Sequence, residues 1–142
     1  YEDLVLCVRR FSTKPARDLS QLYGQMLLNQ AINNRDDHLK NFSFLLGPGL
    51  VALSPAYDLV SGEALGAYPQ LNFKQQPSLP DPATPEAIGA AAAFSLTPAE
   101  AREINDRIAA ALSEVRIIAD QAGLDAADQR FLLQRLPRRF QP

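Results

Sequence analysis

A long amphipathic stripe in the C-terminal third of the chain constrains the fold more than any other feature. It begins at Thr97-Pro98-Ala99-Glu100, which has the form of a capping box with proline at the first helical position. Apolar residues then recur at alternating spacings of three and four until Gly123: Ala101, Ile104, Ile108, Ala111, Val115, Ile118 and Ala122. This is the period of a helix with one buried face. We therefore expect a long helix whose stripe lies in the core.

The other apolar patterns predict a domain that is mainly α with a small β-hairpin. Apolar residues at helical spacing predict a helix over residues 16–32, which ends where Asn33 can adopt the left-handed cap conformation. Residues 42–53 contain two apolar runs around Gly47-Pro48-Gly49 and predict the hairpin. We expect the helical part to span residues 84–137. Residues 3–8 are apolar and rich in β-formers, so a strand is predicted there.

Composition bounds the class of protein and the chemistry of any site. The chain has 142 residues, 46% of them hydrophobic, which suits one domain, 1–142, with its own core. Its net charge of −2 disfavours direct nucleic-acid binding. Cys7 and His38 are the only residues of their kinds, so a metal site would be mainly oxygen-liganded, which favours Mg²⁺. The lone cysteine, with no membrane span or signal peptide, predicts a cytoplasmic protein.

A polar segment after the 16–32 helix carries the spacing most indicative of function. It reads Asn34-Arg35-Asp36-Asp37-His38-Leu39-Lys40-Asn41. Asp36 and Asn41 are spaced like the Asp and Asn of the protein-kinase catalytic loop His-Arg-Asp-x-x-x-x-Asn, with Asn34 in place of the leading His. Phosphoryl transfer requires a carboxylate to accept the hydroxyl proton and an oxygen ligand for the metal on the phosphates. We predict a catalytic loop over 33–41, with Asp36 as base and Asn41 as metal ligand.

Asp58 completes the predicted site. It lies in segment 54–60, which leaves the second strand of the predicted hairpin, seventeen residues beyond Asn41. A hairpin brings its two ends together, so Asn41 and Asp58 should converge. Mg²⁺ is commonly held by one or two carboxylates together with substrate phosphates and water. We therefore predict that Asn41 and Asp58 bind nucleotide-bound Mg²⁺ and that 54–60 is a metal-binding segment.

The neighbouring polar residues leave alternatives open. In one alternative Asp37 is the catalytic base, although the spacing to Asn41 favours Asp36. In the other, Asp37 is a solvated or structural neighbour of Asp36. His38 and Lys40 are assigned to catalysis, His38 by orienting carboxylates or carbonyls and Lys40 by offsetting phosphate charge. In the alternatives, His38 makes only a structural hydrogen bond or is a metal ligand, and Lys40 is a surface residue. In a further alternative, the whole cluster only ends the preceding helix, because Asp and Asn hydrogen-bond their own backbone in turns.

Two stretches around this loop have a more specific pattern. They read Asp36-Asp37-His38-Leu39-Lys40-Asn41-Phe42-Ser43-Phe44-Leu45 and Leu53-Ser54-Pro55-Ala56-Tyr57-Asp58-Leu59. Together they resemble the C-terminal domain of HipA-family kinases, the serine/threonine kinase toxins of bacterial toxin–antitoxin modules. The resemblance implies a protein-kinase-like C-lobe (α+β) with Asp36 as catalytic base, Asn41 as Mg²⁺ ligand and Asp58 as counterpart of the aspartate in the kinase DFG motif. ATP is then the phosphoryl donor.

The same resemblance implies partners and a missing part. HipA-like kinases place a Gly-containing phosphate-binding loop and an ATP-pairing lysine upstream of this region. We find neither, so we expect a fragment without its N-lobe, inactive alone, with a mobile loop over 61–83. The implied substrate is a protein such as an aminoacyl-tRNA synthetase, and the implied partner is a DNA-binding antitoxin of the HipB type.

Two other function classes remain open. One is a catalytically inert docking module for antitoxin or substrate. The other is a small-molecule kinase, because choline- and aminoglycoside-kinase folds share an Asp-x-x-x-x-Asn loop.

Overall fold

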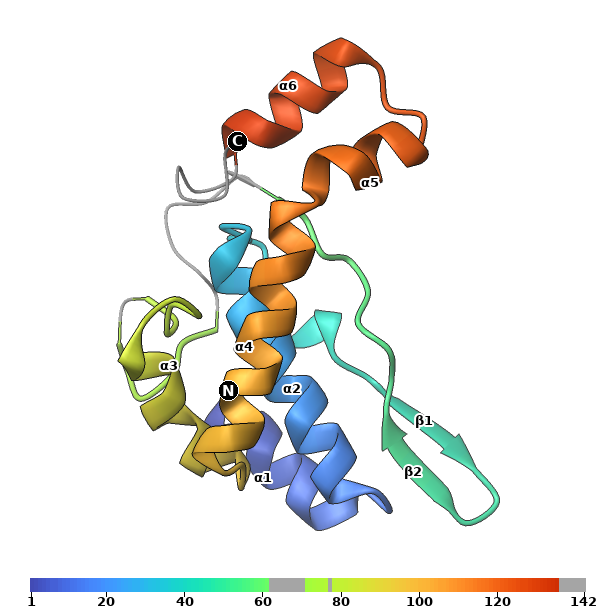
Figure 1. Ribbon diagram of the computed structural model, residues 1–142. Helices are drawn as coiled ribbons and strands as arrows, with labels where there is room; N and C mark the ends of the chain where they lie inside the picture. The colour runs from blue at the N-terminus through green and yellow to red at the C-terminus, as the bar shows by residue number, and fades with distance from the viewer. Residues whose placement is uncertain (62–70, 77, 136–142) are drawn as a thin grey trace.

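The computed structural model describes residues 1–61, 71–76 and 78–135 (Figure 1). Within these ranges the chain is mainly helical with one antiparallel hairpin, as predicted. In chain order the elements are α1 (Glu2–Phe11), α2 (Pro15–Ala31), the 3₁₀ turn η1 (Leu39–Asn41), β1 (Phe44–Gly47), β2 (Leu50–Leu53), α3 (Pro85–Ala90), the 3₁₀ turn η2 (Ala91–Phe94), α4 (Pro98–Ser113), α5 (Val115–Gln121) and α6 (Ala126–Arg135). None of the described helices has the length and apolarity to cross a bilayer.

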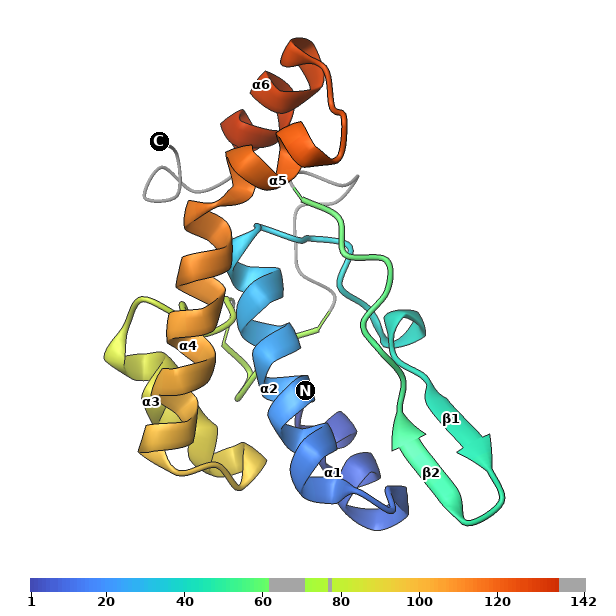
Figure 2. The same cartoon turned by 45° about the vertical axis from the view of Figure 1, so that its right-hand side comes forward.

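Helix α2 forms the centre of the domain. In Figure 2 it lies between α4 and the hairpin, and α1 packs against it. Its side chains Leu22, Tyr23, Met26 and Leu27 are fully buried. The helix has proline in its first turn, and Asn33, with φ of 55°, follows it in the left-handed conformation that the sequence predicts. Helix α2 thereby delivers the loop of residues 33–41 to one end of the core.

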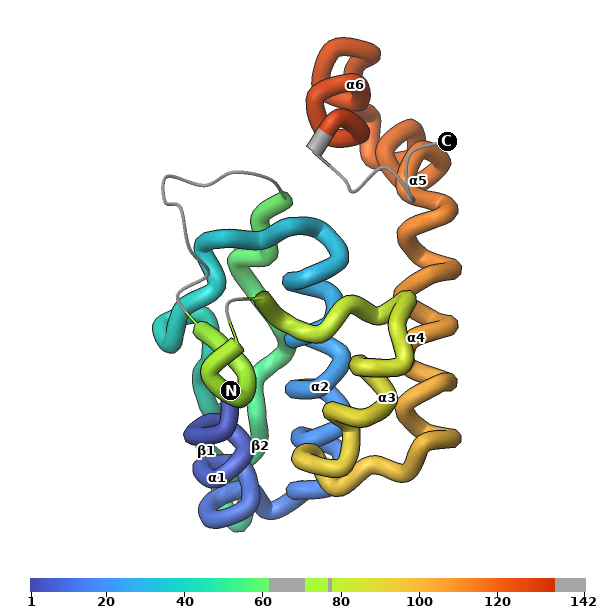
Figure 3. The backbone as a smooth tube through the Cα atoms, turned by 90° about the vertical axis from the view of Figure 1, so that its left-hand side faces the viewer, coloured from blue at the N-terminus to red at the C-terminus, as the bar shows by residue number. Residues whose placement is uncertain are grey.

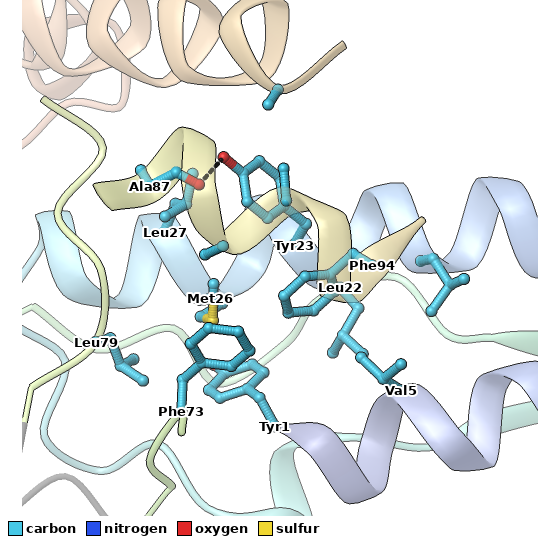
Figure 4. Packing of buried hydrophobic residues seen from close by; sticks show 14 of the residues in the cluster. Tyr1, Val5, Leu22, Tyr23, Met26, Leu27, Phe73, Leu79, Ala87 and Phe94 are labelled. Carbon is cyan, nitrogen blue, oxygen red and sulfur yellow. Dashed lines mark hydrogen bonds between the residues drawn. The ribbon is translucent and has the colours of Figure 1, made fainter. Parts of the chain in front are cut away.

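Aromatic side chains join distant segments beside α2. Figure 4 shows Tyr23 of α2 and Phe73 close to Phe94 of η2, with ring centroids 5.4 Å apart for Tyr23–Phe94 and 5.7 Å apart for Phe73–Phe94. The Tyr23 hydroxyl donates to the carbonyl of Ala87 at 3.0 Å. Burial of this phenol raises the pKa of Tyr23 to about 12. The cluster fixes η2 and the chain around Phe73 against the central helix.

Within 61–83 the sequence Leu71-Asn72-Phe73 also indicates a short strand, and this prediction is wrong. The backbone of these residues forms no helix or strand. The ring of Phe73 is instead buried in the core. The predicted mobile loop, 61–83, falls partly on residues 62–70 and 77, which lie outside the described residues. The remaining divisions of the chain (catalytic loop 33–41, metal-binding segment 54–60 and helical part 84–137) stay predictions as functional units.

The predicted strand over residues 3–8 is also wrong, because these residues belong to α1. Leu4, Val5 and Val8 are buried on one helical face, whereas Leu6 is 59% exposed. A strand would place residues 4, 6 and 8 on the same face, so this burial pattern fits only the helix. Acidic residues in its first turn and arginines in its last turn complement the helix dipole.

The long helix predicted after Thr97 is two helices. The predicted capping box is present, because the Thr97 hydroxyl accepts from the backbone N–H of Glu100 at 3.3 Å. However, α4 ends at Ser113, and α5 and α6 project beyond the body of the domain (Figure 3). The stripe is therefore core only in part. Of the predicted stripe, Ala101 and Ile108 are buried, whereas Ala111, Ile118 and Ala122 are exposed. Leu112 and Ala119, which the predicted stripe did not include, are also buried.

Candidate active site

Buried polar contacts hold the exit of the hairpin against α2. Asp18 is fully buried, and its Oδ2 accepts from the backbone N–H of Leu53 and from the hydroxyl of Ser12, both at 2.7 Å. One turn further along α2, the Gln21 amide donates to the carbonyl of Ser54 at 2.5 Å. Helix α2 therefore sets the start of segment 54–60 as well as the start of loop 33–41.

The side-chain amide of Asn41 joins these two segments. Asn41 ends the turn η1 and is 4% exposed. Its Nδ2 donates to the backbone carbonyl of Asp36 at 3.0 Å and, in a longer contact of 3.5 Å, to that of Asp58. The structure thus brings together the three residues that the sequence spacing singles out, although they are separated by up to 22 positions in the chain.

Asp36 presents its carboxylate at the surface of this junction. Its backbone N–H donates to Oδ1 of the buried Asn34 at 3.0 Å, which fixes the turn. The Asp36 side chain is 43% exposed, and its Oδ1 lies 3.6 Å from Nε2 of His38. His38 itself is 26% exposed in its side chain, and its buried Nδ1 has no partner within the described residues. The carboxylate of Asp36 is therefore accessible, with an imidazole beside it.

Asp58 reaches the junction in a strained backbone conformation. Its φ is 56°, in the left-handed region that non-glycine residues seldom occupy, and such residues cluster at functional sites. The preceding Tyr57 anchors the segment, because its hydroxyl donates to the carbonyl of Lys40 at 2.6 Å. Asp58 and Lys40 are both exposed. Lys40 thus contributes its backbone to this contact and keeps its ammonium group at the surface.

Asp37 has a different environment from its neighbour Asp36. It is fully buried, and its Oδ2 accepts from the hydroxyl of Tyr1 at 2.5 Å, while its Oδ1 has no partner within the described residues. Burial raises the pKa of Asp37, and the hydrogen bond from Tyr1 partly offsets that rise. Burial and the nearby Asp37 carboxylate also raise the pKa of Tyr1. Asp37 is therefore an internal anchor of the loop.

Asn29 completes a buried network that sequence reasoning missed. Its amide donates to the Tyr1 hydroxyl at 3.1 Å, and its own Oδ1 accepts from the Asn34 amide at 3.1 Å. One signal was available: Asn29 follows Leu22 and Met26 at helical spacing, so it is a polar residue on the core face of a predicted helix. Buried polar side chains need hydrogen-bond partners, and such a position indicates a network.

The donor set of the junction suits a hard divalent cation. Both partners of the Asn41 nitrogen are carbonyls, which only accept, so the amide oxygen faces the other way and keeps its lone pairs. With the accessible carboxylates of Asp36 and Asp58, the junction offers oxygen donors, as Mg²⁺ prefers. No three His, Cys, Asp or Glu side chains cluster as a metal site in the described ranges. Water and phosphate would therefore supply the remaining ligands.

Comparison with protein families identifies the domain. Residues 1–116 match the HipA-like C-terminal domain family, and this match covers most of the chain, including loop 33–41 and segment 54–60. The chain belongs to the HipA-like C-terminal domain family. The resemblance inferred from the two motif stretches is thereby confirmed. Helix α6 and most of α5 lie beyond the matched part of this HipA-like domain.

One curated relative of the HipA-like domain is named as a kinase. Over 74 residues the chain is 36% identical to a protein of Sinorhizobium fredii (strain NBRC 101917 / NGR234) named "Putative kinase Y4mE". The match covers 52% of this chain and 17% of that relative, so the chain spans less than a fifth of the relative's length. No solved structure gave a significant match.

Proposed function

We propose that this HipA-like domain is the catalytic-loop and metal-binding part of an ATP- and Mg²⁺-dependent serine/threonine protein kinase, with the architecture of a protein-kinase C-lobe. The observation that carries the proposal is the Asn41 amide, which donates to the carbonyls of both Asp36 and Asp58. A single side chain thereby links the backbone of the proposed base to that of the proposed metal ligand Asp58.

Asp36 is the proposed base. Its accessible carboxylate can accept the proton of a serine or threonine hydroxyl as that oxygen attacks the γ-phosphorus. His38, whose Nε2 lies 3.6 Å from Oδ1 of Asp36, is proposed to orient this carboxylate. Lys40 is close enough in sequence to place its cationic side chain near the transferred phosphoryl group.

Asn41 and Asp58 are the proposed ligands of Mg²⁺. Bound Mg²⁺ would neutralise charge on the phosphates of ATP and orient them. Asn41 offers one neutral oxygen and Asp58 one exposed carboxylate, so the pair leaves most coordination positions for water and phosphate. We therefore expect weak metal binding without nucleotide and tighter binding with it.

The family membership supports a wider biological proposal. In this proposal the parent kinase is the toxin of a cytoplasmic toxin–antitoxin module and phosphorylates a translation protein such as an aminoacyl-tRNA synthetase. A small DNA-binding antitoxin of the HipB type restrains it. Contact with DNA then occurs through the antitoxin, because the chain has a net charge of −2.

A paramagnetic metal titration tests the site in this chain. Mn²⁺, which accepts the same oxygen ligands, should broaden the backbone amide signals of residues around Asp36, Asn41 and Asp58 before all others. Asp58→Asn should reduce this broadening, whereas Asp106→Asn, on an exposed residue of α4, should not. Broadening centred elsewhere, or unaffected by Asp58→Asn, would remove these residues from a metal site.

A transfer assay tests the activity in the native protein that carries this domain. Labelled ATP is supplied with cell-lysate proteins or with a panel of small hydroxyl compounds, and Asp36→Asn serves as the inactive reference. Labelled proteins that disappear in the variant support a protein kinase. Label on small molecules would indicate a small-molecule kinase, and no label with retained partner binding would indicate an inert docking module.

A further inference from the structure

A groove between α2 and α4 has the properties of a peptide-binding site. The two helices run side by side in Figures 1 and 2, and the hollow between them has a volume of about 710 Å³. Leu28, Ile104 and Ile108 are among the apolar residues that line it, and Ala56 of segment 54–60 closes one side. This volume lies in the range of natural ligand sites, which spans about 300–1,000 Å³.

The charged groups of this groove are all positive. Arg17 of α2 and Arg107 of α4 line it, and no aspartate or glutamate does. In the part of the chain that the structure describes, neither guanidinium makes an ion pair or a hydrogen bond. The whole chain carries a net charge of −2, so two uncompensated arginines in one hollow are a local exception. Arginine pairs of this kind suit carboxylates, which accept their N–H groups in pairs.

A buried hydrogen-bond donor in the same groove lacks a partner. Gln25 lines the groove, is 5% exposed, and its buried Nε2 has no hydrogen-bond partner within the described residues. Buried polar atoms are nearly always hydrogen-bonded, so an unsatisfied donor indicates an acceptor that binds from outside. Gln25 and the two arginines all donate, which calls for a ligand rich in carbonyl and carboxylate oxygens.

The groove also has a direction and a length. A second hollow of about 430 Å³ adjoins it, shares Ile104 and Arg107 with it, and is also lined by Arg9, Glu100 and Glu103. Carboxylates therefore line only the second hollow, and Arg107 lies where the two hollows meet. From Glu100 to Ala111, α4 rises about 16 Å, which matches about five residues of extended peptide.

We propose that this groove binds an extended acidic peptide segment of a partner protein. Its carboxylates pair with Arg17 and Arg107, its apolar side chains contact the apolar lining around Ile104, and one of its carbonyls accepts from Gln25. A peptide fits better than a nucleic acid, because two arginines above an apolar floor cannot follow a phosphate backbone. The site is independent of the proposed phosphoryl transfer, so Asp36→Asn should leave peptide binding unchanged.

Titration of this chain with defined peptides tests the proposal. The probe is a labelled five-residue peptide of alternating glutamate and leucine, compared with its lysine–leucine counterpart and with a short oligothymidylate. Only the acidic peptide should bind, and it should shift the amide signals of Gln25, Arg107 and Ala111. The double variant Arg17→Glu/Arg107→Glu should weaken binding by at least about tenfold.

Matched variants separate the groove from general charge. The control variant Arg102→Glu/Arg116→Glu changes the net charge as much as the groove variant does, at two exposed arginines outside the groove. It should alter peptide affinity by less than about twofold. Gln25→Met should weaken binding by about fivefold without lowering the melting temperature, because it removes a donor that is unpaired in the free protein. Equal losses in both arginine pairs, equal binding of the oligothymidylate, or signal shifts confined to residues away from the groove would overturn the proposal.

Discussion

Substitution of the adjacent acids Asp36 and Asp37 separates a catalytic role from a structural one. Asp37 is fully buried and accepts from the Tyr1 hydroxyl, whereas 43% of the Asp36 side chain is exposed. A substrate hydroxyl can therefore reach Asp36 and cannot reach Asp37. We predict that Asp36→Asn lowers phosphate transfer by about 10²–10⁴-fold with little effect on stability. Asp37→Asn should keep transfer within about tenfold of the wild type.

The structure also gives the size of the Asp37 effect on stability. Asp37→Ala removes a charged hydrogen bond and leaves the buried Tyr1 hydroxyl without an acceptor, which costs about 1.5–3 kcal/mol. For a domain of this length the melting temperature should fall by roughly 3 °C per kcal/mol, or about 5–9 °C. Asp37→Asn keeps an acceptor for Tyr1 and removes a buried charge, so its stability at pH 7 should lie within about 1 kcal/mol of the wild type or above it.

The pH dependence of stability has a definite sign. Burial raises the pKa of Asp37 above its ordinary value of 3.8, so the folded state binds this proton more tightly than the unfolded state. The contribution of Asp37 is therefore fully present below pH 3.8 and is lost as the pH rises through the folded-state pKa. Asp37→Asn should flatten this part of the profile, whereas Asp36→Asn should leave it in place.

Urea unfolding followed by circular dichroism between pH 3 and 8 measures the stability effects, and the native protein that carries this domain serves for transfer assays. One pattern would refute the reasoning. If Asp37→Asn abolished transfer with an unchanged fold while Asp36→Asn remained active, the buried acid would be the base. The burial argument would then fail, and with it the assignment of Asp37 as an anchor.

Three further substitutions test the packing and the backbone. Tyr23→Phe leaves the Ala87 carbonyl without its donor and should cost about 1 kcal/mol in urea unfolding at pH 9. Burial raises the pKa of Tyr23 to about 12, so the wild type should lose stability as the pH rises from 10 to 12. The variant should lose less by pH 11.5, although the raised pKa of Tyr1 acts in both proteins. Asp58→Gly relieves a φ of 56° and should raise stability by about 0.5–1 kcal/mol while reducing Mn²⁺ broadening; a fall in stability would argue against backbone strain. Gly24→Ala places a Cβ 3.4 Å from Cγ2 of Ile104 and should raise stability by about 0.5–1 kcal/mol in thermal unfolding. A fall in stability would mean that α2 and α4 cannot move apart enough to accept the added methyl group.

Local signals in the sequence predict the elements that position the candidate site. The apolar spacing in α2, the left-handed cap at Asn33 and the glycines of the hairpin turn each act over a few residues, so they can be read from the chain alone. The approach of Asn41 to Asp58 then follows from hairpin geometry. The proximity of the candidate residues was predictable because the chain segments that present them obey short-range rules.

Long-range packing decides what the sequence did not predict. Residues 3–8 have β-branched and aliphatic side chains, but packing against α2 selects the helix α1. The break at Glu114 has no proline or glycine beside it, so no local signal marks it. The contact between Tyr1 and Asp37 joins residues 36 positions apart, and no spacing rule links them. The sequence therefore left Asp37 undecided between a solvated and a structural role.

The hydrogen bonds that Asn41 donates call for an amide at this position, in addition to its proposed role as a metal ligand. Asn41→Asp is nearly isosteric and would supply a charged metal ligand, yet it would direct a carboxylate oxygen toward the carbonyls of Asp36 and Asp58. The two hydrogen bonds from Nδ2 would be replaced by repulsion at a site that is 4% exposed, at a cost of about 2–3 kcal/mol. We therefore predict that Asn41→Asp lowers stability in urea unfolding and reduces Mn²⁺ broadening at Asp58, because the two segments separate. Tighter metal binding with unchanged stability would mean that metal charge, and not the donated hydrogen bonds, holds the junction together.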